Sequence, residues 1–153
     1  MKKNYCFLLL AMLLQCCLLT SCHEDETIET TNISGNWFVS RIESITAKNV
    51  DDETYDITNK RDYDSNYLAD GSMLVTIADG SSYNTYFVVL YKYINGSWVK
   101  QNQENVALSS KNKFSFNGEE CKFNKGNDTR LAIKTRIDGQ MVRVTLNKTN
   151  LRP

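Results

Sequence analysis

Three dipeptides of the Asn-Gly or Asp-Gly type, at residues 95–96, 117–118 and 138–139, constrain the fold more than any other feature. Each lies between segments rich in β-branched and aromatic residues. Such a dipeptide favours a two-residue type I′ turn, because Asn, Asp and Gly tolerate the positive φ angles that both turn positions need. A two-residue turn also determines which residues of the flanking strands face each other. The sequence therefore predicts three tight hairpins together with the pairing inside each one.

The last hairpin is predicted to have one apolar and one basic face. A turn at residues 138–139 pairs Ile133 with Val144 and Leu131 with Leu146. Side chains alternate between the two faces of a strand, so the opposite face carries the basic residues. These are Arg130, Lys134, Arg136 and Arg143, with Lys134 directly across from Arg143. We predict a basic surface patch here, which is either an ordinary solvated face or a docking face for an anionic partner or lipid headgroup.

The middle hairpin is predicted to bury Cys121. A turn at residues 117–118 sets Phe114 opposite Cys121 and places Phe116 on the same face. A thiol among phenylalanines behaves as a small hydrophobic group, and burial raises its pKa. The pattern therefore argues against Cys121 as a reactive nucleophile.

Consecutive hairpins indicate an all-β chain with meander topology. Further strands are expected at residues 35–45, 73–78, 83–94 and 97–101, with a short strand around Tyr55 and Ile57. The stretch 51–70 is acidic and weakly patterned, so we expect a loop there. About eight strands in one meander close most economically into a small up-and-down antiparallel β-barrel, because closure removes the sheet edges. The alternative is a two-sheet β-sandwich.

The N-terminus resembles that of bacterial lipoproteins. Lys2 and Lys3 precede a short apolar run that ends in Leu19-Thr20-Ser21-Cys22, a match to the lipobox. In that family the cysteine is acylated and becomes the first mature residue. The resemblance implies a signal peptide at residues 1–21, a lipidated acidic tether at 22–32 and a β domain at 33–153. Secretory cleavage at another site and an N-terminal apolar helix are the alternatives.

The residues after Cys22 bear on location. In bacterial lipoproteins, an aspartate directly after the cysteine resembles an inner-membrane retention signal. This chain has His23 at that position, so the resemblance implies an outer-membrane lipid anchor. Acidic residues at 24–26 look like the surface-export signals of Bacteroidetes lipoproteins, and a plain solvated tether explains them equally well. The domain is thus expected to face the periplasm or the cell surface.

The first strand resembles that of lipocalin-like domains. Gly35-Asn36-Trp37 matches the Gly-x-Trp motif with which that family opens, although the family's mid-chain signature has no clear counterpart. In the family the tryptophan plugs the barrel floor, and an arginine of the last strand packs across it. The resemblance implies that Trp37 is the floor residue and that Arg143 or Arg136 is its partner. Trp37 as an ordinary core aromatic is the alternative.

Two functions follow from such a barrel. In the first, a cavity lined by aromatic residues such as Phe87, Tyr91 and Trp98 binds a small apolar or glycan ligand. In the second, the barrel is packed solid and the protein is an interaction module, such as an envelope-complex subunit or a toxin-immunity lipoprotein. The second predicts no cavity and an exposed patch made by the basic hairpin or by residues 51–70.

Catalytic and nucleic-acid functions have little support in the sequence. The single histidine, His23, lies beside the lipobox cysteine, so no Cys-His, Ser-His or histidine-based metal site is expected. No glycine-rich phosphate loop occurs, and we expect no cofactor. Residues 22–80 hold 13 acidic and 4 basic side chains, whereas 81–153 hold 5 acidic and 12 basic ones. Two such halves either neutralise each other or leave a polarised surface, and no dense basic cluster suggests nucleic acid.

Overall fold

The computed structural model describes residues 33–153. The signal peptide at 1–21, the lipidation site Cys22 and the tether at 22–32 are sequence predictions that lie outside these residues. Every regular element from residue 33 onward is a strand. Within this range no helix is long and apolar enough to cross a membrane.

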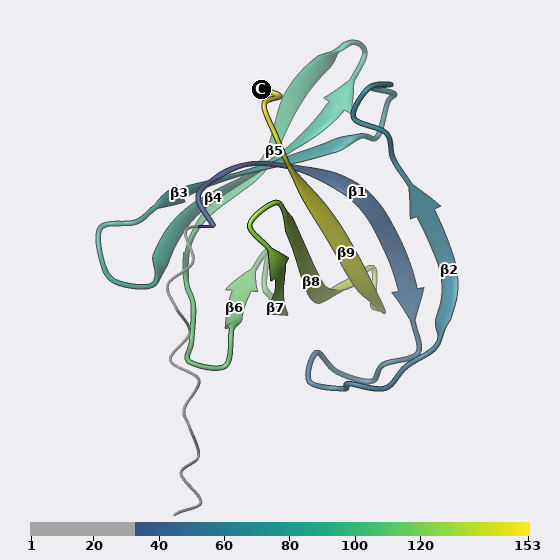
Figure 1. Cartoon of the computed structure of the whole chain (residues 1–153), viewed down its shortest axis with the longest axis vertical. Coiled ribbons are helices and arrows are strands. Elements are labelled where there is room, and N and C mark those ends of the chain that lie inside the picture. The colour runs from purple at the N-terminus through teal and green to yellow at the C-terminus, as the bar shows by residue number, and fades with distance from the viewer. Residues whose placement is uncertain (1–32) are drawn as a thin grey trace, which may run out of the picture.

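The strands form one antiparallel sheet that curls into a nearly closed barrel (Figure 1). They are β1 (Gly35–Ile45), β2 (Ile57–Asp62), β3 (Met73–Asp79), β4 (Thr85–Ile94), β5 (Ser97–Ala107), β6 (Lys113–Phe116), β7 (Glu119–Asn127), β8 (Arg130–Ile137) and β9 (Gln140–Thr149). The order around the barrel is β5-β4-β3-β1-β9-β8-β7-β6, so the first and last strands meet, while β5 and β6 share no ladder. The predicted all-β up-and-down barrel is confirmed, and the two-sheet sandwich is not adopted.

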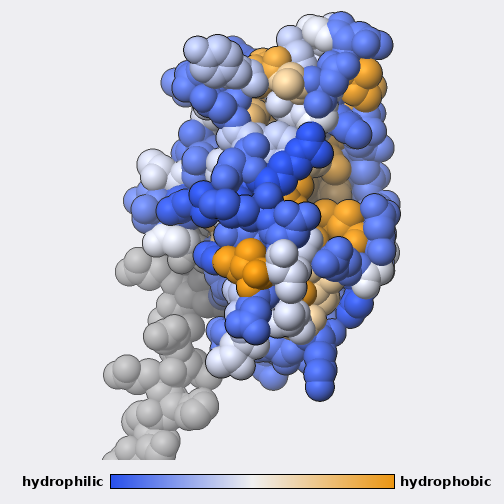
Figure 2. All heavy atoms as spheres, turned by 90° about the vertical axis from the view of Figure 1, so that its right-hand side faces the viewer, coloured by the Kyte–Doolittle hydropathy of each residue, from blue (hydrophilic) through white to orange (hydrophobic). Residues whose placement is uncertain are grey.

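The sheet forks along β1. One edge of β1 pairs with β3 over residues 35–38 and, after an irregularity at Ser40, with β2 over residues 41–45. The other edge pairs with β9 along most of its length. On the edge opposite β9, the neighbour of β1 is therefore β3 over its first residues and β2 over its last residues. Figure 2 faces this side of the barrel and shows mostly hydrophilic side chains, with scattered apolar ones among them.

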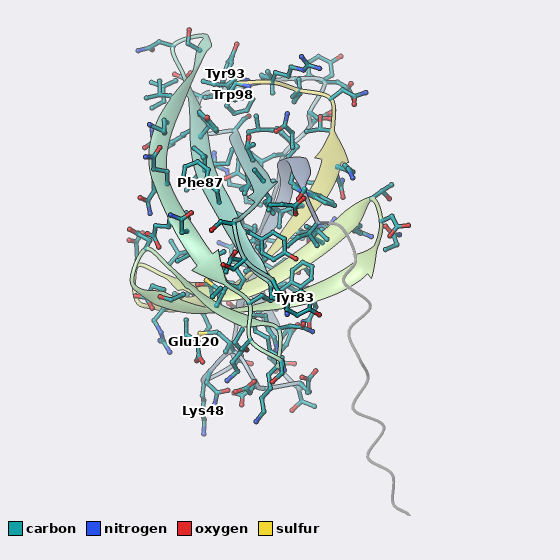
Figure 3. The ribbon with its side chains drawn as sticks, turned by 90° about the vertical axis from the view of Figure 1, so that its left-hand side faces the viewer. Lys48, Tyr83, Phe87, Tyr93, Trp98 and Glu120 are labelled. Atoms are coloured by element: carbon teal, nitrogen blue, oxygen red, sulfur yellow. The ribbon has the colours of Figure 1, made fainter. Side chains whose placement is uncertain are left out.

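All three tight hairpins have the predicted turns and registers. The φ angles are +50° and +82° at residues 95–96, +55° and +78° at 117–118, and +49° and +79° at 138–139. Cross-strand pairs match the expected ones, including Phe114 with Cys121 and Lys134 with Arg143. Figure 3 shows Tyr93 and Trp98, another predicted pair, together near the tip of the β4–β5 hairpin. Strands β5 and β2 are longer than predicted, since β5 continues to Ala107 and β2 runs to Asp62.

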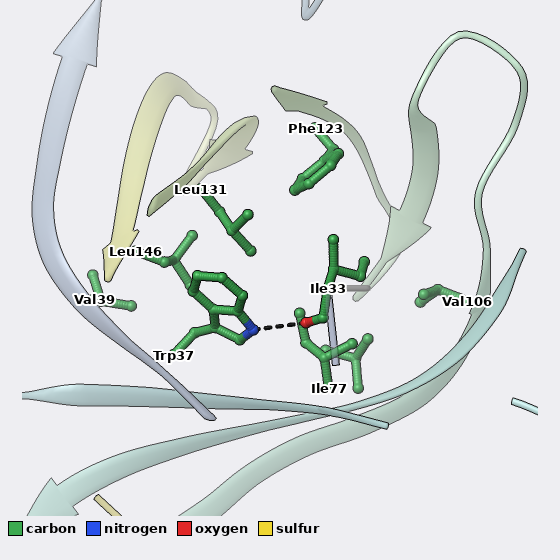
Figure 4. Packing of buried hydrophobic residues seen from close by; sticks show 9 residues of the cluster. Ile33, Trp37, Val39, Ile77, Val106, Phe123, Leu131 and Leu146 are labelled. Atoms are coloured by element: carbon green, nitrogen blue, oxygen red, sulfur yellow. Dashed lines mark hydrogen bonds between the residues drawn. The ribbon is translucent and has the colours of Figure 1, made fainter. Parts of the chain in front are cut away.

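The main core lies inside the barrel around Trp37. It joins residues from opposite walls, among them Val39, Ile77, Leu131 and Leu146 (Figure 4). These side chains come from β1, β3, β8 and β9 and point to the inner face of the sheet, since residues two apart along a strand share a face.

A second, smaller core lies on the outside of the barrel. The connection between β1 and β2, residues 46–56, crosses the outer face of β8 and β9, and we call it the strap. Ala47 and Val50 of the strap bury themselves with Ile45 and Met141, and Tyr55 packs against them. Part of the acidic stretch that was expected to be a loop is thus a packed cover over the last hairpin.

Candidate functional site

The barrel encloses an apolar cavity of about 350 Å³ that is partly open to solvent. Its walls are the inward side chains of β1, β3, β4, β8 and β9, together with those of the β5 end and of β6 and β7. The lining residues are Ile33, Val39, Ile42, Met73, Val75, Ile77, Tyr86, Val88, Leu90, Val106, Leu108, Phe114, Phe116, Asn117, Glu119, Cys121, Phe123, Leu131, Ile133, Thr135, Arg136, Ile137, Val144 and Leu146. A chamber of this size is at the lower end of the range for small-molecule sites.

Polar groups border the cavity mainly at the end formed by the β6–β7 and β8–β9 turns. Asn117, Glu119 and Arg136 lie there. The Arg136 guanidinium is already engaged, because it donates to the main-chain oxygens of Gly139 (2.9 Å) and Lys48 (3.1 Å). The interior beyond this rim therefore favours hydrocarbon over a glycan, whose hydroxyls would lack partners.

Cys121 is part of the wall, as the hairpin register predicted. The residue is buried, and its Sγ lies 3.2 Å from the Thr135 hydroxyl. Burial, the largest effect, raises the pKa of the thiol, and the nearby hydroxyl lowers it less. The group therefore stays a neutral thiol at neutral pH, which fits a wall residue better than a nucleophile.

Trp37 fills the opposite end of the barrel. The side chain is 1% exposed, and its indole N–H donates a 2.8 Å hydrogen bond to the Ile33 carbonyl oxygen. The ammonium group of Lys148, on the last strand, lies 5.5 Å from the Trp37 ring centroid. Trp37 is thus buried inside the barrel with a lysine, not an arginine, as the cation over its ring.

The predicted arginine partner of Trp37 is wrong. Arg143 lies on the outer face instead, where it pairs with the buried Glu43 carboxylate at 3.6 Å. Arg136 is at the other end of β8, held by the two carbonyls named above. The last strand carries two cations, Arg143 and Lys148, and the sequence did not distinguish which of them reaches Trp37.

The three predicted ligand-binding aromatics do not line the cavity. On β4 the residues that do are Tyr86, Val88 and Leu90, so Phe87 and Tyr91 point to the outer face. Trp98 packs edge-to-face on Tyr93, with ring centroids 5.1 Å apart, at the hairpin tip. Residues 87–90 are all apolar, so alternation gave no signal for choosing between the two faces. A predicted β5 that extended to Val106 would have identified the inward face of β4, because buried Val106 lies directly opposite Tyr86.

The predicted basic surface patch is also not a free surface. Lys134 is 2% exposed, because the strap covers it, and its ammonium donates a 2.6 Å hydrogen bond to the Asp52 main-chain oxygen. Arg136 and Arg143 are partly buried and have the partners given above, so Arg130 alone of these four residues is exposed. The register placed these residues on one face correctly, but the cover comes from a segment far away in the sequence.

Ion pairs fasten the strap to the barrel. Asp51 pairs with Lys113 and, at 3.4 Å, with Lys122, while Glu53 pairs with Lys122 at 3.1 Å. The hydrogen bond from Lys113 is the largest influence that lowers the pKa of Asp51, and the same contact raises the pKa of Lys113. At this contact the acidic first half of the chain neutralises the basic second half.

Neither a metal site nor a recognisable relative helps to assign chemistry. Among residues 33–153 no three His, Cys, Asp or Glu side chains gather closely enough to hold a metal ion. No protein-family model and no curated protein matches the sequence. Among solved structures the chain is similar to the siderocalin Ex-FABP, described as functioning through dual ligand specificities. The two share 10% sequence identity at a TM-score of 0.49, over 78% of this chain and 76% of that one.

Proposed function

We propose that the barrel binds a small apolar molecule in its interior. The observation that carries this proposal is the cavity of about 350 Å³ with an almost wholly apolar wall. A packed barrel would have closed such a space, since interiors are otherwise filled to crystal-like density. Small-molecule sites typically combine an apolar chamber with a few polar groups at one end, and this cavity has that character.

The alternative, an interaction module without a ligand, has less support. It predicted a solid barrel and an exposed patch made by the basic hairpin or by residues 51–70. Instead the strap buries Lys134 and pairs with Lys113 and Lys122. The basic hairpin and the start of the 51–70 stretch are therefore largely internal contacts of the fold, whereas most of residues 57–70 are exposed.

The experiment is binding of N-phenyl-1-naphthylamine, an uncharged dye whose fluorescence rises in apolar surroundings. We expect saturable binding that Ile133→Trp abolishes by filling the cavity. Phe87→Ala, on the outer face, is the matched control and should leave binding unchanged. Because Ile133→Trp is also a risk to folding, the reaction rate of Cys121 with a thiol reagent is measured in the unmodified protein. The bound dye should slow it, and dye binding without any such protection would place the dye elsewhere and contradict the proposal.

We further propose that Cys22 carries a lipid anchor in the outer membrane. The support is the lipobox match and the apolar run before it. A diacylated or triacylated cysteine would hold the chain stably, since each buried methylene contributes about 0.8 kcal/mol. Metabolic labelling with an alkynyl palmitate analogue should mark the protein and should fail for Cys22→Ser. Labelling that survives this substitution would refute the anchor.

A further inference from the structure

A second hollow adjoins the apolar cavity at the fork in the sheet. It has a volume of about 270 Å³ and is lined by Arg61, Tyr63, Gly71, Met73, Leu90, Lys92 and Gln101. Met73 and Leu90 belong to the walls of both spaces. The two are therefore neighbouring compartments, one apolar and one with two cationic side chains.

The strand registers direct both cations toward the concave side of the sheet. Arg61 lies opposite Ile42 in the β1–β2 ladder, and Lys92 lies opposite Met73 in the β3–β4 ladder. Residues directly opposite each other in an antiparallel pair project on the same face. Ile42 and Met73 both line the apolar cavity, so Arg61 and Lys92 continue its inner face outward to the rim.

Neither cation has an acidic partner among the described residues. Asp62, next to Arg61, points the other way and pairs with Arg41 at 2.5 Å and with Lys60 at 3.7 Å. Asp70 is near the hollow, but its carboxylate accepts a 2.9 Å hydrogen bond from the Asn95 main-chain N–H. The Arg61 guanidinium instead lies over the Tyr63 ring, 5.1 Å from its centroid, which holds it beside the hollow.

We propose that the ligand is an anionic amphiphile with a single slender apolar chain. The chain would occupy the apolar cavity, and a carboxylate or phosphate group at its end would lie between Arg61 and Lys92. This inference rests on the proposed function of the cavity. The rim at the β6–β7 turn is a poorer place for an anion, because the Glu119 carboxylate lines it and the Arg136 guanidinium is engaged.

The test compares an anionic with an uncharged probe on the same protein. The protein carries Cys22→Ser, so that no detergent is needed to hold an anchor in solution. The anionic probe is cis-parinarate, a fluorescent chain carboxylate, and the uncharged one is N-phenyl-1-naphthylamine. Arg61→Gln with Lys92→Gln should weaken cis-parinarate binding about 5- to 10-fold, as two solvent-exposed charge contacts allow, and leave the uncharged dye unaffected.

A matched control removes the same charge from the other face. Lys60 lies on β2 next to Arg61, and Lys100 lies on β5, the strand that pairs with β4. They are opposite Glu43 and Tyr91, which point away from the interior. Lys60→Gln with Lys100→Gln should leave cis-parinarate affinity unchanged. Dodecanoate and dodecyl phosphate should each compete with cis-parinarate more strongly than dodecanol does, which would support an anionic headgroup. The stronger competitor of the two identifies whether carboxylate or phosphate is preferred.

The outcomes separate the two proposals. If both probes bind and the Arg61 and Lys92 substitutions change nothing, the headgroup assignment is wrong while the cavity remains a binding site. If the matched control weakens cis-parinarate binding by the same factor, the effect comes from net charge, and the headgroup assignment is again wrong. Failure of both probes to bind any variant would instead refute the proposed function itself.

Discussion

The ammonium group of Lys134 donates a 2.6 Å hydrogen bond to the main-chain oxygen of Asp52, which ties β8 to the strap 82 positions earlier. The same group lies 5.4 Å from the centroid of the Tyr55 ring, also on the strap. Desolvation, the largest effect, lowers the pKa of Lys134, and the nearby carboxylates of the strap oppose that change. A residue that alternation alone places on a basic surface is thus a buried contact between distant segments.

Lys134→Ala should lower the free energy of unfolding by about 2 kcal/mol or more, measured by urea denaturation. The substitution removes a packed aliphatic stem and leaves a carbonyl oxygen without its donor. Lys134→Met keeps the stem and removes the desolvated charge, so its effect should be under about 1.5 kcal/mol. Equal stability of Lys134→Ala and the unmodified protein would show that the strap does not pack on β8 in solution.

Asp51→Asn should lower the melting temperature by a few degrees at pH 7, and this effect should shrink as pH falls below about 4. The folded pKa of Asp51 is lowered, so its contribution is present above the unfolded carboxyl pKa of about 4 and is lost as pH falls through the folded value. Thermal melts of both proteins across pH 3–8 measure the difference. Asp56→Asn, on the same strap, is the control and should be nearly neutral. A pH-independent effect of Asp51→Asn would contradict the ion-pair explanation.

Trp37→Ala should destabilise the barrel by about 3–5 kcal/mol, because it empties the floor of the core. The matched change at the other tryptophan, Trp98→Ala, should have a much smaller effect, since Trp98 packs only on Tyr93 at the hairpin tip. Urea unfolding followed by circular dichroism compares the two. Similar losses for both variants would be inconsistent with Trp37 as the floor residue.

Gly80→Ala should be more damaging than Gly139→Ala. A Cβ at Gly80 would lie 2.8 Å from the Thr85 main-chain carbon and oxygen and still closer to the Thr85 hydroxyl, which forces the β3–β4 turn to move. At Gly139 nothing lies within 4 Å, so the penalty is only the positive φ of +79°, about 1–2 kcal/mol. Thermal melts of both variants test this order, and the reverse order would mean that the β3–β4 turn relaxes easily.

The predictions that succeeded depended on local chemistry. The Asn-Gly and Asp-Gly dipeptides specify their turns through φ angles that few residues tolerate, and each turn then sets the register of the strands beside it. That reasoning identified the strands of these three hairpins, the inward position of Cys121 and the barrel topology. The prediction of the cavity wall failed on β4, because four consecutive apolar residues carry no alternation.

By itself, the sequence determined the all-β class and the hairpin registers, since turn propensity and alternation act over a few residues. Only the tertiary structure decided that the strap covers Lys134, that Lys148 rather than Arg143 lies against Trp37, and that Arg61 and Lys92 border one hollow. Each of these depends on contacts between segments far apart in the chain. Such contacts form because burying apolar surface and neutralising charge stabilise the whole fold, and no local pattern encodes which distant partner is used.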